Sequence, residues 1–245
     1  MSRHLLVIGA QRCGTTFLHA LLDAHPEITM ARPARPEPKV FCADETAGRG
    51  LQWYRETYFQ HATTESLLGE KSTSYLEDAQ APKRAADVLG EAHILVLLRD
   101  PVERAISNWR FSTQHGLETR PLEEALRDNL ARETPWDPSR TSVSPFAYLE
   151  RGRYAEYLEP WMTSFPATTH VVFLPDLVGD DRTLDDLWNA LGVASGFRPD
   201  RCAYAVNQSE GDPPVLTAEL LGTLRMHFEE SNFALSAQLG RDLPW

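Results

Sequence analysis

The sequence has no long hydrophobic run and little cysteine. Its first apolar stretch, HLLVI at His4–Ile8, ends at Gly9, whereas a membrane-spanning helix needs about 20 apolar residues and the apolar part of a signal peptide is also longer than this stretch. Three cysteines at wide spacings give neither a disulfide framework nor a paired metal motif. We therefore expect a soluble, cytoplasmic protein in a reducing compartment.

Positive charge is also in short supply. The chain carries 24 Lys and Arg against 35 Asp and Glu, a formal net charge of −11. Nonspecific nucleic-acid surfaces and surfaces that bind anionic membranes both need an excess of Lys and Arg, so we expect neither partner. The eight histidines have no metal-ligand spacing such as H-x-x-E-H, and we expect no metal. Basic residues must therefore be locally concentrated if the ligand is an anion.

One glycine-rich stretch, GAQRCGTT at Gly9–Thr16, resembles a phosphate-binding loop but lacks the usual lysine. The loop of ATP- and GTP-using enzymes reads G-x-x-x-x-G-K-[ST], with the lysine reaching the terminal phosphates. Here Thr15 follows the second glycine, and the loop's cation is Arg12. The stretch predicts an anion-binding loop that departs from the pattern for nucleoside triphosphates.

The loop lies between a predicted strand and a predicted helix. His4–Ile8 is typical of a buried parallel strand, and Thr15–Ala24 has helical spacing of its apolar residues. Backbone N–H groups at such a helix start point at a bound anion. A second strand, Ile94–Leu98, precedes a helix from Pro101 to about Gln114, with Asp100 as its N-cap.

Strand-like and helix-like segments alternate without a linker. The pattern predicts an α/β fold: one domain, P-loop-like and three-layered, with a central parallel sheet flanked by helices. We expect Ala31–Pro38 to be extended and Arg132–Ser144 to be an irregular lid or insertion. The later predicted elements are a helix at Tyr154–Phe165, a strand at Val171–Leu174, a helix at Leu184–Leu191 followed by Gly192, and a helix at Thr217–Glu230.

A second candidate anion site follows the strand at Ile94–Leu98. Arg99 ends that strand, Ser107 lies two turns into the next helix, and Arg104 is predicted to share the helix face of Ser107. A guanidinium and a hydroxyl suit a phosphate dianion. Two anion sites at the ends of two strands imply one elongated ligand with two separated anionic groups.

These two motifs also carry a family resemblance. GAQRCGTTFLHALLDAHP and LLRDPVERAISNWRFS resemble the 5′-phosphosulfate loop and the 3′-phosphate motif of sulfotransferases. The resemblance implies one sulfotransferase domain over residues 1–245 and an enzyme that uses 3′-phosphoadenosine 5′-phosphosulfate (PAPS) without a metal and releases 3′-phosphoadenosine 5′-phosphate (PAP). The donor-binding residues it implies are Arg12, Cys13, Gly14, Thr15, Thr16, Arg99 and Ser107. The Cys13 thiol itself is expected to be a buried bystander.

Further segments extend the likeness to the heparan-sulfate-type and bacterial branch. EKSTSY, at Glu70–Tyr75, resembles the stretch E-K-[ST]-P-x-Y, with Thr73 where proline is usual. GRYAEYLEPWMTSFP, from Gly152, and LGRDLPW, at the end of the chain, resemble two other segments of that branch.

The general base implied by the resemblance is Glu37. PEPKVF matches the branch's K-E-P-x-F-F at the glutamate, the following proline and one phenylalanine, but Pro36 replaces the lysine. His25 and His115 are the alternatives, because other sulfotransferases use histidine. Lys71 is a candidate second cation on the sulfuryl group. Glu37 as a solvated loop carboxylate, and Lys71 as a local ion pair with Glu70, are the competing interpretations.

Two other classes stay open on the residues alone: a P-loop kinase or nucleotide hydrolase, and a nucleotide-binding module without turnover. For the leading class, the acidic chain favours a small, roughly neutral hydroxylated acceptor such as a sugar or an aromatic metabolite. A long polyanionic glycan would need a basic patch such as Arg32, Arg35 and Lys39. We expect a bacterial-type enzyme of secondary metabolism, and the sequence indicates no oligomeric state.

Overall fold

The computed structural model describes residues 3–137, 139, 141, 143–199 and 214–245. The chain divides into two compact units, each made of two segments. The first unit comprises Met1–Leu98 and Tyr157–Asn207, and the second comprises Arg99–Glu156 and Gln208–Trp245. Each unit is described separately below.

The first unit is built on a five-stranded parallel sheet with the order β2-β3-β1-β4-β5. The strands are β1 (Arg3–Gly9), β2 (Ile28–Met30), β3 (Leu67–Lys71), β4 (Ala92–Leu98) and β5 (Thr169–Phe173). β1 lies in the centre, paired with β3 on one side and β4 on the other. The predicted α/β fold with a central parallel sheet is confirmed.

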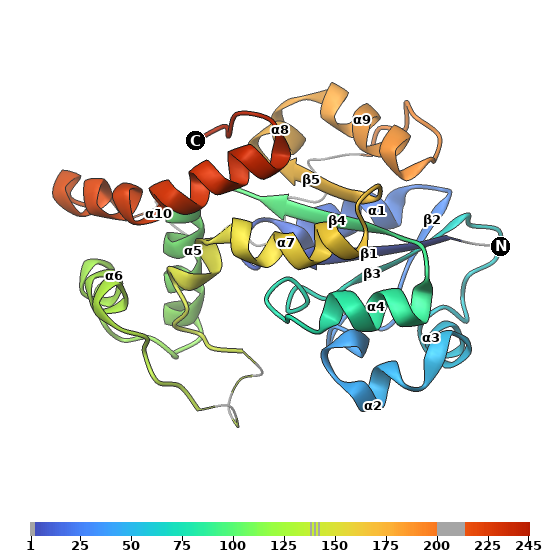
Figure 1. Ribbon diagram of the computed structural model, residues 1–245, viewed down its shortest axis with the longest axis horizontal. Coiled ribbons are helices and arrows are strands. Elements are labelled where there is room, and N and C mark those ends of the chain that lie inside the picture. The colour runs from blue at the N-terminus through green and yellow to red at the C-terminus, as the bar shows by residue number, and fades with distance from the viewer. Residues whose placement is uncertain (1–2, 138, 140, 142, 200–213) are drawn as a thin grey trace. The chain divides into compact units, whose positions relative to one another are not determined.

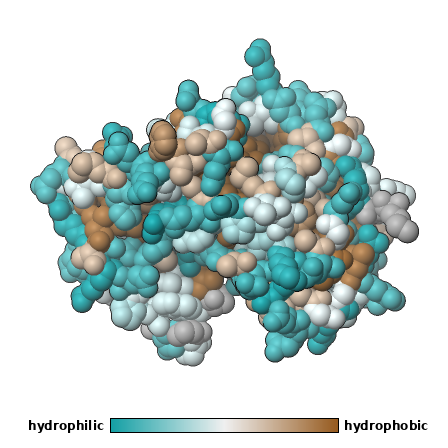
Figure 2. Space-filling model, in the orientation of Figure 1, coloured by the Kyte–Doolittle hydropathy of each residue, from teal (hydrophilic) through white to brown (hydrophobic). Residues whose placement is uncertain are grey.

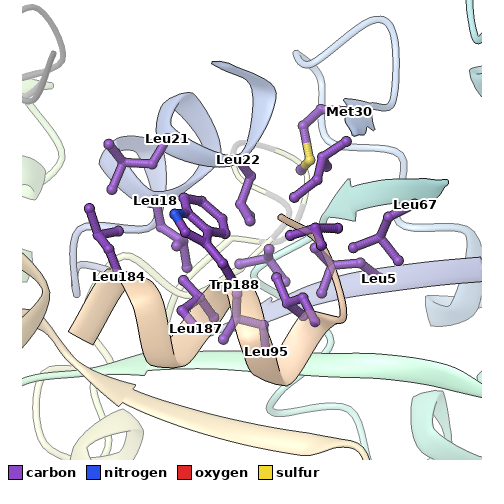
Figure 3. Packing of buried hydrophobic residues seen from close by; sticks show 14 of the residues in the cluster. Leu5, Leu18, Leu21, Leu22, Met30, Leu67, Leu95, Leu184, Leu187 and Trp188 are labelled. Atoms are coloured by element: carbon purple, nitrogen blue, oxygen red, sulfur yellow. The ribbon is translucent and has the colours of Figure 1, made fainter. Parts of the chain in front are cut away.

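One face of the sheet is covered by α1 (Thr15–Ala24), α8 (Leu174–Gly179) and α9 (Asp181–Leu191). Residues of β1 alternate between the two faces, and Leu5 and Val7 join this side of the core. In Figure 3, the side chains of Leu184, Leu187 and Trp188 from α9 face the leucines of α1. This packing fixes α1, and with it the loop that precedes α1, against the sheet.

The other face carries short helices from the first third of the chain. They are η1 (Val40–Cys42), α2 (Asp44–Ala47), α3 (Gly50–Tyr58) and α4 (Ala81–Leu89), and α4 lies on the side of the sheet opposite α9 (Figure 1). A group of buried aromatic rings links η1, α3 and the segment after β3. The ring centroid of Phe41 lies 5.7 Å from that of Tyr54 and 5.5 Å from that of Tyr75.

The second unit is helical over the residues that are described. Its elements are α5 (Pro101–Gln114), α6 (Leu122–Ala131), η2 (Glu150–Gly152) and α10 (Ala218–Leu239), and α7 (Tyr154–Ser164) crosses the boundary between the two units. Buried apolar side chains of α5, α6 and α10 form its core, among them Ala105, Leu126, Leu224 and Phe228. This core holds the N-terminal half of α5.

Most of the predicted elements are present, with shifted ends. The helix predicted from Pro101 to about Gln114 is confirmed, and the Asp100 side chain accepts the backbone N–H groups of Val102 and Glu103. The predicted strand at Val171–Leu174 is instead Thr169–Phe173, because Leu174 begins α8 and a proline suits the first turn of a helix. The last helix continues to Leu239. The described part of Arg132–Ser144 is irregular, as expected.

On the face shown in Figure 2, hydrophilic residues are interspersed with hydrophobic ones. No helix among the described residues has both the length and the apolar character needed to cross a membrane.

Candidate active site

The predicted anion loop leaves the carboxyl end of β1 and leads into α1. Gly14 is the N-cap of α1, with φ of 86°, and it provides no side-chain cap. No side chain at Gly14 therefore occupies the backbone N–H groups of the first turn, which face the loop. N–H groups in this arrangement bind anions at helix starts. A Cβ atom on Gly14 would lie 2.8 Å from Leu174 Cδ1. Both the conformation and the space at this position require glycine.

Arg12 adopts a backbone conformation that is uncommon for a residue with a side chain. Its φ is 68°, in the left-handed region, and such outliers cluster at binding and active sites. The loop around it is fixed by backbone hydrogen bonds, from Ala10 N to Leu97 O at 2.9 Å and from Cys13 N to Ala10 O at 3.2 Å. Cys13 is fully buried, as expected of a bystander thiol, and Thr15 is buried beside it.

Glu37 and Lys71, predicted from two separate motifs, contact each other. The Lys71 ammonium donates to Glu37 Oε1. The side chain of Lys71 is 10% exposed and that of Glu37 is 18% exposed, so Glu37 is not the solvated loop carboxylate of the competing interpretation. The ion-pair partner of Lys71 is thus Glu37 and not its sequence neighbour Glu70, as the other competing interpretation had it.

Thr73 completes the set of donors around Glu37. Its backbone N–H donates to Glu37 Oε2 at 2.9 Å, and its hydroxyl donates to the same oxygen at 3.1 Å. An ionised carboxylate offers about four acceptor positions. Lys71 and the two groups of Thr73 take three of them, which holds the carboxylate in one orientation and leaves it able to accept one more donor.

The sheet places this carboxylate at the same edge as the anion loop. β1 and β3 are parallel neighbours with Val7 opposite Lys71, and Ser72 N donates to Val7 O at 3.1 Å. Lys71 therefore ends its strand where β1 runs into the loop of Arg12. Carboxyl ends of parallel strands are where ligands bind in open α/β sheets.

His19 was not predicted from the sequence, and its environment places it near the Glu37–Lys71 pair. It is half-buried on α1, one turn after Thr15. Burial lowers the pKa of His19; Asp23 and Glu37 act to raise it, while Lys71 and Arg32 lower it further. The spacing of four residues from Thr15 is the only sequence signal that could have pointed to it.

The two alternative histidines have structural contacts of their own. His25 is buried, and its ring centroid lies 4.8 Å from that of Trp188 and 4.9 Å from that of Phe197. Its Nδ1 accepts Glu27 N at 3.2 Å, and its Nε2 lies 3.1 Å from Ala194 O. Both ring nitrogens of His25 are thus used inside the first unit.

His115 lies in the second unit and is exposed. Its Nδ1 lies 2.8 Å from Phe111 O, at the end of α5, and its ring packs on that of Phe111 with 4.0 Å between centroids. These contacts belong to the end of a helix.

The second predicted anion motif belongs to the second unit. Arg99 Nη2 donates to Glu103 O at 2.8 Å, and Ser107 is half-buried on α5. Arg104, which is predicted to share the helix face of Ser107, points into the interior of the second unit. Arg104 is fully buried, and its Nη2 donates to Ala147 O at 3.2 Å and to Tyr148 O. Those carbonyls lie far along the chain, so no local pattern could reveal that this arginine ties α5 to a loop.

Within the described ranges, no group of three or more His, Cys, Asp or Glu side chains is placed to hold a metal ion.

Comparisons with known proteins agree on one family. Residues 2–174 match the family model described as "Sulfotransferase domain". Bifunctional heparan sulfate N-deacetylase/N-sulfotransferase 3 of Homo sapiens is 32% identical over 193 residues, covering 77% of this chain and 22% of that protein. Heparan sulfate glucosamine 3-O-sulfotransferase 3B1 of Mus musculus is 27% identical over 267 residues, covering 98% of this chain and 64% of that protein. The chain thus spans about a fifth of the first relative and just under two thirds of the second.

A solved structure extends the likeness in fold to nearly the full length. The crystal structure of a sulfotransferase from Alicyclobacillus acidocaldarius superposes with a TM-score of 0.80 and covers 99% of this chain and 98% of its own. At 24% identity, this match concerns the fold alone.

Proposed function

We propose a donor, an acceptor class and a general base for this chain. The chain belongs to the sulfotransferase domain family and is a sulfotransferase. The reaction moves the sulfuryl group of PAPS to a hydroxyl, or less readily an amine, of a small molecule or sugar. The observation that carries the proposal is the half-buried cluster of Glu37, Lys71 and Thr73 at the sheet edge where the anion loop begins.

The donor is assigned from the loop chemistry. Arg12, the backbone of Cys13 and Gly14, and the hydroxyls of Thr15 and Thr16 bind the 5′-phosphosulfate, because N–H groups and a guanidinium suit an anion at a helix start. In the second unit, the 3′-phosphate is assigned to Arg99 and Ser107 by the resemblance of their segment. Positive side chains take the place of the magnesium that a nucleoside triphosphate brings.

The chemical step is an in-line transfer. Glu37 accepts the proton of the acceptor hydroxyl through its remaining acceptor position, and the hydroxyl oxygen forms a bond to sulfur. The bond between sulfur and the bridging oxygen of the 5′-phosphate breaks, and the electron pair leaves with PAP. The products are the sulfate ester, PAP and a proton on Glu37. Arg12 and the loop N–H groups stabilise the charge that builds on the leaving phosphate, and Lys71 stabilises the sulfuryl oxygens.

The acceptor is small and carries little negative charge. Of the three basic residues that could receive a polyanion, Arg32 is already paired with Asp23, with Nη2 2.7 Å from Oδ2. That pairing weakens the attraction of the patch for an anionic glycan, and the net charge of −11 adds to the repulsion. The names of the relatives specify heparan sulfate, whereas we propose a neutral sugar or an aromatic metabolite for this chain. We further propose a cytoplasmic enzyme of bacterial type that serves secondary metabolism.

Transfer of radioactive sulfate from labelled PAPS tests this proposal. The acceptors are 4-nitrophenol, glucosamine, N-acetylglucosamine and a desulfated heparan oligosaccharide. We expect label on at least one of the three small acceptors. For Glu37→Gln we expect a kcat lower by about 10²–10⁴-fold, the usual contribution of a general base, with the Kd for PAP unchanged.

The exposed Glu45 provides the matched control, and Glu45→Gln should transfer at the wild-type rate. Label on the oligosaccharide alone would overturn the acceptor class. A normal kcat for Glu37→Gln would overturn the choice of base.

A further inference from the structure

Glu70 is a fully buried carboxylate that takes no part in the proposed reaction. It lies on β3, one residue before Lys71, with no exposed surface. Three hydroxyls donate to it: Ser72 Oγ at 2.6 Å and Tyr75 Oη at 2.6 Å to Oε1, and Tyr54 Oη at 2.7 Å to Oε2. Burial raises the pKa of Glu70, and the three hydroxyl donors oppose that rise. Burying a carboxylate costs folding free energy unless hydrogen bonds compensate for the lost water. The three hydroxyls supply these hydrogen bonds.

Two of the three hydroxyls also accept a hydrogen bond from the backbone. Lys39 N donates to Ser72 Oγ at 2.9 Å, and Phe41 N donates to Tyr75 Oη at 3.2 Å. A hydroxyl has one proton. Because each hydroxyl gives that proton to Glu70, its lone pairs are turned toward the backbone N–H. Glu70 therefore fixes the orientation of both hydroxyls as acceptors for these backbone N–H groups.

The two backbone N–H groups belong to the segment that carries Glu37. Lys39 is two residues beyond Glu37 and has a left-handed backbone with φ of 51°, which needs support from its surroundings. On the other side, Ser72 lies between Lys71 and Thr73, the two residues whose groups donate to Glu37. The hydrogen bonds from Glu70 thus reach both the segment that carries the base and the segment that donates to it.

We propose that Glu70 is a positioning residue, which holds Glu37 in its reactive orientation through the hydroxyls of Ser72 and Tyr75. This inference rests on the proposed function of Glu37. Loss of either hydroxyl frees the segment 37–41 at one point, and a displacement of about 1 Å at a reacting group can cost about 10²-fold in rate.

Tyr54 provides a matched control, because it makes the same hydrogen bond without the onward link. Tyr54 and Tyr75 are both fully buried, and both phenols donate to Glu70. Among the described contacts of the segment 37–41, the N–H of Phe41 reaches Tyr75, while Tyr54 meets that segment through ring packing on Phe41. Tyr54→Phe and Tyr75→Phe thus remove the same chemical group from the same carboxylate.

The test compares kcat, the KM for PAPS and Tm for Tyr75→Phe, Ser72→Ala and Tyr54→Phe, with the best of the four acceptors named above. We expect Tyr75→Phe and Ser72→Ala to lower kcat by about 10–100-fold, with KM for PAPS within about twofold of wild type. Tyr54→Phe should also lower Tm, by less than Tyr75→Phe because it leaves the Phe41 N–H bond intact, and should leave kcat near wild type. A merely structural role would affect both tyrosine variants alike.

Two further variants test Glu70 directly. In Glu70→Gln, the amide oxygen can still accept the hydroxyls of Ser72 and Tyr75, while the amide N–H₂ donates to the hydroxyl of Tyr54. The kcat of this variant should therefore stay within about threefold of wild type. Glu70→Met has a similar size but accepts neither hydroxyl, and it should lose kcat about as much as Ser72→Ala and Tyr75→Phe combined. Wild-type kcat in a folded Glu70→Met enzyme would overturn the proposal.

A double-mutant cycle separates this inference from the proposed function. If Tyr75 acts through Glu37, Tyr75→Phe should have no further effect on kcat in the Glu37→Gln background. Equal kcat losses in Tyr54→Phe and Tyr75→Phe would contradict the positioning role but not the proposed function. The same holds if Tyr75→Phe lowers kcat as much in the Glu37→Gln background as in wild type. If Glu37→Gln itself keeps wild-type kcat, or if wild type transfers no label, the proposed function fails and the positioning role fails with it.

Discussion

At the scale of residues, Glu37 depends on its neighbours for its orientation. Three donors from Lys71 and Thr73 surround the carboxylate, and two more backbone contacts hold the segment that follows it. Preorganised groups of this kind do not have to reorganise during the reaction, which is where much enzymatic rate enhancement comes from. The same hydrogen bonds in solvent would contribute little.

A buried histidine makes the stability of the first unit depend on pH. His4 is 3% exposed, and its Nε2 accepts Arg55 Nε at 3.1 Å. Burial and the nearby Arg55 lower the pKa of His4 to about 4, from 6.5 in the unfolded chain. The unfolded chain therefore binds more protons than the folded chain between these values, so the free energy of unfolding should fall as the pH drops from about 6.5 to about 4.

Thermal unfolding at pH 7 and pH 5 measures this effect, and His4→Gln should make the drop in Tm between the two smaller. The drop should not disappear, because burial also lowers the pKa of His93 to about 4. His115→Gln, at an exposed position, is the control and should behave as wild type. A drop in Tm that is equal in His4→Gln and wild type would show that His4 does not cause it.

Residue types with local signals could be predicted from the sequence, whereas their partners could not. Glu37 and Lys71 each stand in a recognisable motif, but their contact spans 34 positions and depends on how β2 and β3 pair. Arg104 lies three residues before Ser107, the spacing of a shared helix face, but its carbonyl partners, 43 and 44 positions away, hold it inside the protein. Non-local contacts decided both outcomes.

At the scale of elements, the junction of β1 and α1 is held by contacts from two neighbouring elements. Leu174, the first residue of α8, fills the space beside Gly14, and Leu97 O of β4 accepts Ala10 N. The loop is therefore held by elements on both sides before any ligand binds. We expect this rigidity to lower the cost of ordering the loop around the donor.

Two glycine variants test whether the space at Gly14 matters beyond its backbone angle. Gly14 and Gly50 have φ of 86° and 80°, but a Cβ atom at Gly50 would meet nothing within 4 Å. Gly50→Ala should therefore cost about 1–2 kcal/mol of unfolding free energy from conformation alone. Gly14→Ala should cost about 1–3 kcal/mol more, from overpacking against Leu174, and should weaken PAP binding at least tenfold.

Urea unfolding and calorimetry measure these two quantities. Equal stability losses in the two variants, with normal PAP binding by Gly14→Ala, would show that the loop tolerates a side chain at this position.

Elements with strong signals were predicted well, and short ones were not. The apolar runs of β1 and β4 and the Asp100–Pro101 start of α5 were evident from the sequence. β2 has three residues and α2 has four, too few to show a period of 2 or 3.6. α10 runs nine residues past its predicted end, from Glu230 to Leu239, to a left-handed Gly240 with φ of 62°. Its exposed Met226 and Phe233 obscured the pattern of the buried face.

At the scale of the whole molecule, the chain is acidic while the donor proposed for it is strongly anionic. The net charge of −11 repels such a ligand at long range, so attraction has to come from a few cations and N–H groups placed at short range. Each unit carries one of the two predicted anion motifs, the Gly9–Thr16 loop in the first and Arg99 with Ser107 in the second. Screening by salt should then strengthen association, since it weakens the long-range repulsion more than the close contacts.

The central claim is that the chain recognises a 3′,5′-bisphosphate rather than a triphosphate, and calorimetric titration tests it most directly. Without magnesium, PAP and ATP are each titrated into wild type, Arg99→Ala and Arg110→Ala, the last being a control on the helix that follows Arg99. We predict that wild type and Arg110→Ala bind PAP at least tenfold more tightly than ATP, and that Arg99→Ala loses about 10–100-fold in PAP affinity, the value of a charge-assisted hydrogen bond. Tighter binding of ATP, or PAP binding unaffected by Arg99→Ala, would contradict the account.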